Sequence, residues 1–179
     1  MTAPRLFHIS EDPGIKVFKP RPSPSYFEAI KGDVVFAIAD TLLHNYLLPR
    51  DCPRVTFYAN NNTAQSDKEK FFGTSPADFV IAIEEKWYSA VQQAILYCYE
   101  FAPGNFSLLD NGAGYYISYT TETPVACCTI TDILKELQAR KVELRRMDTL
   151  WPLARQVSQS TLQYSLIRMR NALPEEAVL

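Results

Sequence analysis

The chain has 179 residues, a net charge of −2, and 47% hydrophobic and 21% charged residues. This length is typical of one globular domain, and this composition excludes a disordered or a fibrous protein. We therefore expect one domain over residues 1–179, with an ordered core from about 5 to 172 and a short tail over 173–179.

The charged residues form no basic cluster, because no run of Lys and Arg exceeds two residues and the pI is about 5.7. Nucleic-acid-binding proteins usually carry a basic face, so no nucleic-acid partner is expected. No apolar stretch has the roughly 20 residues that span a bilayer, and the first residues lack the apolar segment of a signal peptide. These features predict a cytoplasmic protein without a membrane partner. The sequence is compatible with a small-molecule ligand, and it does not determine the oligomeric state.

The first predicted strand is 5–9, where alternation puts Leu6 and His8 on one face. The proline-rich segment 19–25 cannot join a central strand, since proline lacks the backbone donor. The polar segment 60–70 is expected to be a mobile surface loop. Hydrophobic periodicity and turn residues predict the other elements. The expected strands are 34–38, 54–59, 96–101, 115–119, 125–130, 142–145 and 164–168, and the expected helices are 41–48, 75–94, 132–139 and 151–158.

The predicted strands are clustered instead of alternating one by one with helices. The segments 115–119 and 125–130 are expected to pair as a hairpin. A clustered order is typical of α+β folds. The predicted fold is therefore α+β, a bent or split, mainly antiparallel sheet with about four helices.

The cysteines are too irregularly spaced for a zinc site or a disulfide framework, because no CxxC motif occurs. Adjacent Cys127 and Cys128 lie in an apolar, strand-like run. Only two histidines are present, so a histidine-rich metal site is excluded. The pattern favours reduced, mostly buried thiols and no bound metal.

His8 stands on the first predicted strand and is followed by Ser10 and an acidic turn. A neutral imidazole offers one hydrogen-bond donor and one acceptor. We interpret His8 as a candidate catalytic residue and Ser10 as a candidate ligand-binding residue. The alternative is that His8 is a core histidine bonded to the backbone.

The motif PRDCPR, residues 49–54, is the second polar cluster. Arg50 and Arg54 are candidates for holding a phosphate or a carboxylate with two hydrogen bonds each. Asp51 is a candidate base or a partner of either arginine. Cys52 is a nucleophile only where its pKa is lowered, which neighbouring arginines favour. The alternative interpretation of the whole motif is an ion pair that stabilises a proline-rich turn.

Arg168 and Arg170 are two further candidate ligand-binding residues near the end of the chain. If 164–168 is a strand, alternation places both arginines on one face. A central strand then directs them into a pocket, whereas an edge strand makes them surface charges.

The segments LFHISEDPGIKVFKPR, VVFAIAD, LLPRDCPRVTFYA and LWPLARQVSQSTLQYSLIRMRNA resemble a small bacterial family of unknown function. The resemblance spans 6–172, and PRDCPR is among its specific parts. It implies no mechanism, because the family has no assigned activity.

The opening strand with His8 and the strand VVFAI also resemble the start of ADP-ribosyltransferase-type folds. This resemblance implies NAD as the cofactor, with His8 on the NAD ribose and an aromatic residue of the second strand, Phe36, stacked on the nicotinamide. It also implies an acid on a later strand, for which Glu100 and Glu122 are the candidates. The function predicted on this basis is a small-ligand-binding, ADP-ribosyltransferase-like domain.

A non-catalytic interaction or stress-response module is the alternative function. PRDCPR is then a structural turn, and exposed aromatic residues mark the partner surface. The aromatic candidates are Tyr97, Tyr99, Tyr115, Tyr116 and Tyr119. A hydrolase that uses Cys52 as its nucleophile is a third hypothesis.

Overall fold

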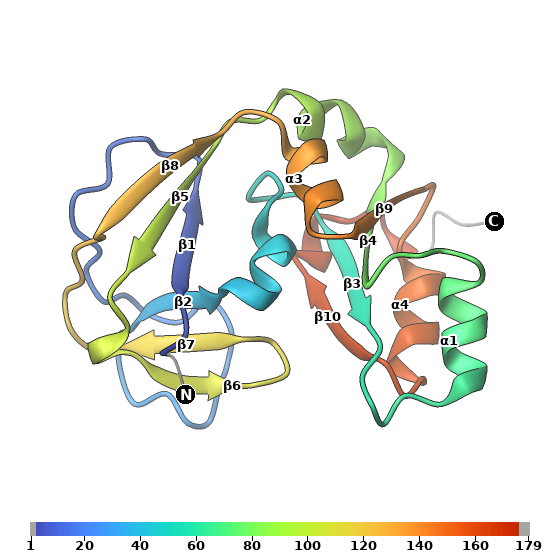
Figure 1. Ribbon diagram of the computed structural model, residues 1–179, viewed down its shortest axis with the longest axis horizontal. Helices are drawn as coiled ribbons and strands as arrows, with labels where there is room; N and C mark the ends of the chain where they lie inside the picture. The colour runs from blue at the N-terminus through green and yellow to red at the C-terminus, as the bar shows by residue number, and fades with distance from the viewer. Residues whose placement is uncertain (1–2, 176–179) are drawn as a thin grey trace. The chain divides into compact units, whose positions relative to one another are not determined.

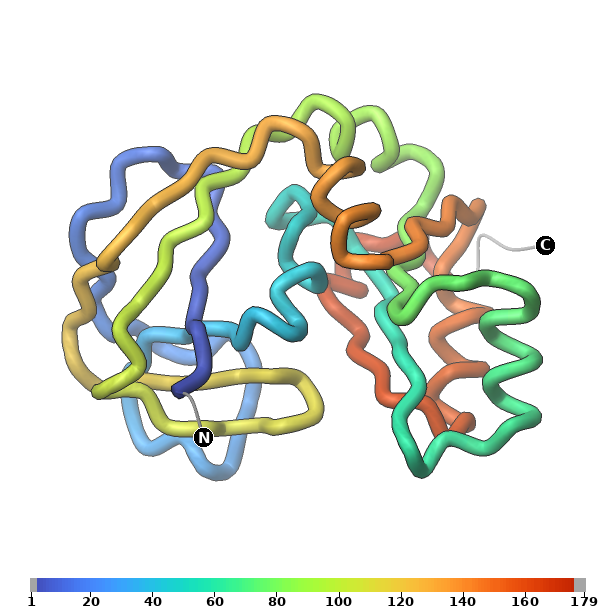
Figure 2. Tube along the Cα trace, in the orientation of Figure 1, coloured from blue at the N-terminus to red at the C-terminus, as the bar shows by residue number. Residues whose placement is uncertain are grey.

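The computed structural model describes residues 3–175, which divide into two compact units (Figure 1). The first unit comprises 3–46 and 95–131, and the second comprises 47–94 and 132–175. The blue N-terminal part of the trace in Figure 2 belongs to the first unit and the red C-terminal part to the second. Each unit therefore combines two segments that are distant in the sequence.

The first unit contains a six-stranded antiparallel sheet with the strand order β6-β7-β2-β1-β5-β8. Two short 3-10 helices, η1 (Asp40–Tyr46) and η3 (Pro103–Asn105), follow β2 and β5. The strands are β1 (Leu6–Ser10), β2 (Val35–Ala39), β5 (Leu96–Phe101), β6 (Ser107–Asp110), β7 (Tyr115–Ser118) and β8 (Ala126–Ile130).

The core of the first unit lies on the face of the sheet that carries Leu6, which is 0% exposed. The loop after β1 folds back over this face, and Phe18 packs against it. The ring of Phe18 meets the rings of Tyr99 and Phe101 edge-on, with centroids 5.2 and 5.0 Å away. The buried members of this cluster are Leu6, Phe18, Val35, Ala37, Tyr99 and Phe101.

The second unit contains a four-stranded sheet with the order β10-β3-β4-β9. Its strands pair antiparallel except for β4 and β9, which are parallel. The strands are β3 (Arg54–Tyr58), β4 (Phe79–Glu84), β9 (Val142–Met147) and β10 (Gln163–Ile167). The helices are α1 (Gln65–Phe72), α2 (Tyr88–Gln93), α3 (Ile133–Ala139) and α4 (Trp151–Ser158), with 3-10 turns η2 (Glu85–Trp87) and η4 (Met169–Asn171).

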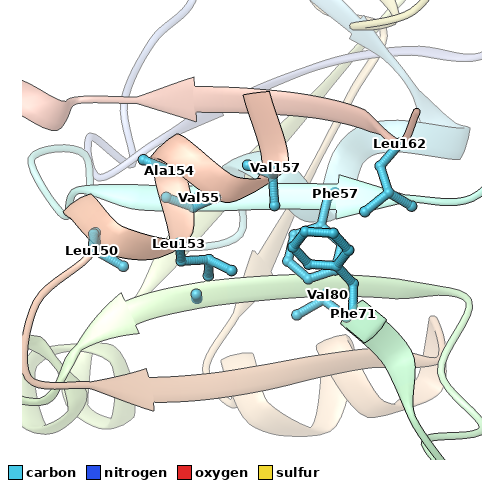
Figure 3. Close-up of a cluster of buried hydrophobic side chains, with 10 residues drawn as sticks. Val55, Phe57, Phe71, Val80, Leu150, Leu153, Ala154, Val157 and Leu162 are labelled. Carbon is cyan, nitrogen blue, oxygen red and sulfur yellow. The ribbon is translucent and has the colours of Figure 1, made fainter. Parts of the chain in front are cut away.

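The core of the second unit forms where α4 and the end of α1 cover one face of β3 and β4 (Figure 3). Leu150 and Val157 bring the apolar side of α4 onto this face, and both are 0% exposed. Phe71 of α1 packs against Phe57 of β3 with ring centroids 5.7 Å apart. Aromatic pairs of this geometry contribute about 0.5–1.5 kcal/mol beyond their area burial.

These two sheets confirm the predicted α+β fold with a split, mainly antiparallel sheet. The expected strand 96–101 and the expected helix 151–158 match β5 and α4. No helix within residues 3–175 is both long and apolar enough to cross a membrane. The last four residues of the expected tail, 176–179, lie outside the described residues.

The predicted helix over 75–94 is wrong for its first half, which contains the strand β4. Residues 80–83 are each 0% exposed, because β4 is covered on both faces and has β3 and β9 on its two sides. The Ser75 hydroxyl accepts from the backbone N–H of Ala77 at 3.3 Å and closes a turn instead of capping a helix. The predicted loop over 60–70 is also wrong, since α1 begins at Gln65.

The predicted hairpin between 115–119 and 125–130 is wrong as well. β7 pairs with β2 and β6, whereas β8 pairs with β5 on the other side of the sheet. Because β8 is the last strand of the order, its two adjacent thiols, Cys127 and Cys128, are exposed rather than buried. Cys52 and Cys98 are buried, as expected.

Gly114 is a glycine that this fold requires. Its φ is +69°, and a Cβ there would lie 3.1 Å from Cδ1 of Leu42. We expect Gly114→Ala to lower the free energy of unfolding by about 1–2 kcal/mol, through backbone strain and contact with Leu42. Gly104→Ala is the matched control, since nothing lies within 4 Å of its Cβ position. Urea denaturation measures both, and equal midpoints for the two variants would contradict the assignment.

Candidate functional site

The sheet of the first unit is split between β1 and β2. β1 pairs with β5 along its whole length, but it pairs with β2 at only two positions, Leu6 with Ala39 and Phe7 with Ile38. Beyond them β1 and β2 diverge (Figure 1). We call the place between residues 8–10 and 35–37 the split.

His8 lies at the split, and its Nδ1 is 3.1 Å from the carbonyl oxygen of Phe36. Asp40 N–H donates to the Arg5 carbonyl, so alternation turns the backbone groups of Ile9 toward β2 as well. In a continued ladder, Ile9 N–H would donate to Phe36. The imidazole takes this carbonyl instead.

This hydrogen bond decides the tautomer of His8. A carbonyl oxygen can only accept, so Nδ1 carries the proton and donates to Phe36. In the neutral ring Nε2 then carries a lone pair and is an acceptor. His8 is therefore a histidine bonded to the backbone, as the second of the two earlier interpretations has it, and its role as a catalytic residue stays a prediction.

The ring of His8 is held from the side by Phe18, with centroids 4.9 Å apart. Phe18 is placed by the loop after β1, and Tyr99 fastens that loop. The Tyr99 hydroxyl donates to the Asp12 carbonyl at 2.6 Å and accepts from Ile15 N–H at 3.2 Å. Burial raises the pKa of Tyr99, so it stays a neutral donor. The imidazole consequently has both a polar and an aromatic support.

A buried carboxylate joins the same side of the sheet through Phe18. The backbone of Phe18 pairs in both directions with Glu122, which is 6% exposed. Ser118 and Thr120 donate their hydroxyls to Oε1 of Glu122 at 2.5 and 2.9 Å. Of the two acids considered from the sequence, Glu122 is the one connected to His8 by these contacts.

Ser10 follows His8 by two residues on β1, and Phe36 lies across the split on β2. The Ser10 hydroxyl accepts from Asp12 N–H at 3.1 Å and closes the turn after β1. Phe36 is half-buried, and its ring lies 6.2 Å from those of Phe27 and Tyr115. The strand register puts the side chains of His8 and Phe36 on opposite faces. Both can meet one ligand only at the split itself.

A hollow of about 210 Å³ lies in the first unit, where β1 begins and β2 ends. Arg5, Asp40, Asn111 and Tyr116 give it polar lining groups. Arg5 is already paired with Glu100 through two hydrogen bonds of 2.8 and 3.0 Å. This pairing lowers the pKa of Glu100, so the second candidate acid is already engaged in an ion pair with Arg5.

The other candidate residues belong to the second unit. Within PRDCPR, Arg50 and Asp51 are exposed, whereas Arg54 is 2% exposed. The motif forms a turn in which Cys52 N–H donates to the Pro49 carbonyl at 3.0 Å. The Asp51 carbonyl accepts from the Asn171 side chain at 2.8 Å. The motif thus ties the start of β3 to the end of the chain.

The end of this motif lies among buried charged residues and does not form an exposed anion-binding site. Glu84 is 0% exposed, and its Oε1 accepts from Leu173 N–H at 2.7 Å. Lys86 Nζ lies 3.2 Å from its Oε2. Burial raises the pKa of Cys52 to about 11, although the charge of Arg54 opposes this. The thiol is therefore protonated near neutral pH, which argues against a nucleophilic Cys52.

Arg168 and Arg170 do not share a strand face, so the alternation argument is wrong. β10 ends at Ile167, and Arg168 has a left-handed φ of 54° that starts the turn η4. Period-two alternation holds only in extended backbone. β10 is also an edge strand, and Arg170 is exposed.

Most of the tyrosines considered as a partner surface are not exposed. Of the five tyrosines, only Tyr119 is exposed, at 47%. Tyr99 is 2% exposed and works inside the fold. Within residues 3–175, no three His, Cys, Asp or Glu side chains are grouped to hold a metal.

Sequence reasoning did not include Phe18 and Ser118 among the candidate site residues. Ser118, Thr120 and Glu122 are spaced by two, a pattern that does predict a shared side in extended chain. Nothing local indicates that Phe18 packs against His8, because this contact depends on how the loop after β1 folds back onto the sheet.

A family model described as "Family of unknown function (DUF6886)" matches residues 7–172. The chain belongs to this family. The match is near full length and includes both units of this DUF6886 protein. No curated protein and no solved structure matches the chain. The first resemblance seen in the sequence is therefore confirmed, and the resemblance to ADP-ribosyltransferase-type folds stays a prediction.

The reactivity of the four cysteines tests which of their thiols are exposed and which are buried. We expect iodoacetamide at mildly alkaline pH to modify Cys127 and Cys128 in dilute native protein, and to leave Cys52 and Cys98 unmodified until denaturant is added. Peptide mass spectrometry identifies the modified residues. Rapid modification of Cys52 in the native state would contradict its burial and raised pKa.

The Arg5–Glu100 pair predicts a pH dependence. Arg5→Met should raise the pKa of Glu100 toward its ordinary value of 4.5, because the guanidinium stabilises the charged carboxylate. A lowered folded pKa stabilises the protein above 4.5, and this contribution is lost as the pH falls through the folded value. The variant should therefore be less stable than the parent at neutral pH and equally stable in acid. Side-chain carbon NMR and urea denaturation at several pH values measure both effects, with Lys16→Met as the control.

Proposed function

We propose that the first unit binds a small ligand at the split, and that the nicotinamide riboside half of NAD is the type of ligand it takes. The observation that carries this proposal is the hydrogen bond from His8 to the Phe36 carbonyl. It fixes the orientation of an imidazole where the backbone pairing of β1 with β2 stops after two positions.

The chemistry of the split matches such a ligand group by group. His8 Nε2 accepts a hydrogen bond from a ribose hydroxyl. Ile9 presents a backbone N–H and C=O toward β2 by ladder alternation, which is the donor and acceptor pair that a carboxamide requires. Phe36 supplies an aromatic ring beside the carbonyl that holds His8. This proposal assigns no role to the other candidate residues, Arg50, Asp51, Arg54, Arg168 and Arg170.

Glu122 is the acid of this proposed site. Two hydroxyl donors on one oxygen orient its carboxylate, and its backbone pairs with that of Phe18, whose ring packs against His8. An ADP-ribosyltransferase-like reaction uses an acid to orient the ribose, and we assign that role to Glu122. A reducing, cytoplasmic setting accords with four free cysteines.

His8→Asn tests the proposal. An asparagine amide can still donate to the Phe36 carbonyl, but it lacks the Nε2 acceptor. We expect NAD and nicotinamide to bind the parent protein in calorimetry, and His8→Asn to weaken NAD binding about tenfold, which is the value of one hydrogen bond. Lys16→Ala, an exposed change in the same unit, should bind like the parent.

Separate ligands distinguish the parts of the proposal. Binding of nicotinamide but not of ADP-ribose supports the split as the nicotinamide subsite. Release of nicotinamide from NAD by the parent, and its loss in Glu122→Gln, supports a catalytic acid. The absence of binding of both NAD and nicotinamide at millimolar concentration would overturn the proposal, as would unchanged NAD affinity in His8→Asn.

A further inference from the structure

β8 forms one edge of the six-stranded sheet, and its open side carries no charge. Its residues from Ala126 to Thr129 are exposed, and the preceding Val125 is 65% exposed. Residues 124–131 contain no Asp, Glu, Lys or Arg. Proteins usually protect sheet edges with charges, bulges or proline, because an open edge pairs readily with another strand.

The opposite edge strand, β6, has such protection. Its pairing with β7 shifts register between Leu108 and Asp110, which is a bulge-like irregularity, and Asp110 adds a charge at its end. Within Ala126–Ile130, β8 has neither a register shift in its pairing with β5 nor a charged residue, in contrast to β6.

Ladder alternation identifies the backbone groups on the open side of β8. Asp40 N–H donates to Arg5, so the odd residues of β1 face β2 and its even residues face β5. It follows that the backbone N–H and C=O groups of Cys98 and Glu100 in β5 point toward β8. The hydrogen bond from Val125 N–H to the Glu100 carbonyl agrees with this direction. The outward-facing residues of β8 are then Cys127 and Thr129.

We propose that this edge binds a second copy of the same chain, with β8 pairing antiparallel to β8 of the other copy around Cys128. An uncharged strand meets no like charge when it pairs with itself, which a charged edge cannot avoid. Centring the pair on Cys128 places Cys127 opposite Thr129, so all four outward-facing residues of the two strands form ladder hydrogen bonds.

Other registers use fewer of these groups. A pair centred on Cys127 places Thr129 opposite Val125, whose N–H is already donated to Glu100. The Cys128 register also places exposed Val125 of one copy opposite Thr131, just after the end of β8, of the other.

This register predicts which cysteine lies opposite the same cysteine of the second copy. Cys128 faces Cys128 as a pair without ladder hydrogen bonds, for which the Cα atoms lie about 4.5 Å apart. This separation falls within the range that a disulfide spans. Cys127 points to the opposite face, on the same side of the sheet as Tyr99, its partner in the register with β5.

Two variants of Thr129 test the pairing. Thr129→Pro removes an outward N–H without removing a hydrogen bond to β5, and edge strands tolerate such a proline. Thr129→Val is the matched control, since it retains that N–H. In sedimentation velocity, the parent and Thr129→Val should become dimeric as the concentration rises, while Thr129→Pro stays monomeric. Circular dichroism verifies that Thr129→Pro is folded.

Mild oxidation with copper phenanthroline gives an independent measurement on the full chain. Cys127→Ser should form a disulfide-linked dimer on a non-reducing gel, and Cys128→Ser should not. A parent protein that stays monomeric at every concentration would overturn the proposal. Equal cross-linking of the two cysteine variants, which indicates random collision, would overturn it as well. Neither measurement involves NAD, so its result is independent of the proposed ligand site.

Discussion

The hydrogen bond from the His8 imidazole to the Phe36 carbonyl allows β1 and β2 to separate inside a sheet without leaving that carbonyl unpaired. A buried carbonyl without a partner costs free energy comparable to a lost hydrogen bond, so a sheet rarely opens away from its edges. Here a side chain of β1 replaces the backbone donor that the ladder would supply. The ligand site proposed at the split depends on this substitution.

Three segments that are distant in sequence hold the imidazole in place. The loop after β1 brings Phe18 against the ring, Tyr99 of β5 fastens that loop, and Glu122 pairs with the Phe18 backbone. Each contact is ordinary by itself. Because Tyr99 and Glu122 hold Phe18 and its loop, and Phe18 packs against the imidazole, they restrict the ring orientation, and preorganisation of this kind lowers the entropic cost of binding at the proposed site.

The second unit uses its polar residues differently. Glu84 and Arg54 are buried, and the turn formed by PRDCPR is bonded to the end of the chain through Asn171. Removing one member of such a buried charged group is generally costly, because its partner then stays buried without compensation. Polar residues gathered in sequence therefore make contacts within the fold in this unit, whereas the ligand site proposed in the first unit depends on a single histidine.

The sequence by itself determined the fold class, the strand β5, the helix α4 and the candidacy of His8, because these follow from local periodicity and side-chain chemistry. It did not reveal α1, whose N-cap residue, Ala64, makes no side-chain hydrogen bond and which is anchored by Asp67 to Thr161 far along the chain. Nor did it separate a buried strand from a helix at 79–84, since an apolar run fits both. The tertiary structure alone decided that β7 and β8 lie apart, that Cys127 and Cys128 are exposed, and that Phe36 meets His8 through its carbonyl. The physical reason is that strand order, edge position and register depend on which distant segments pair, and no local pattern carries that information.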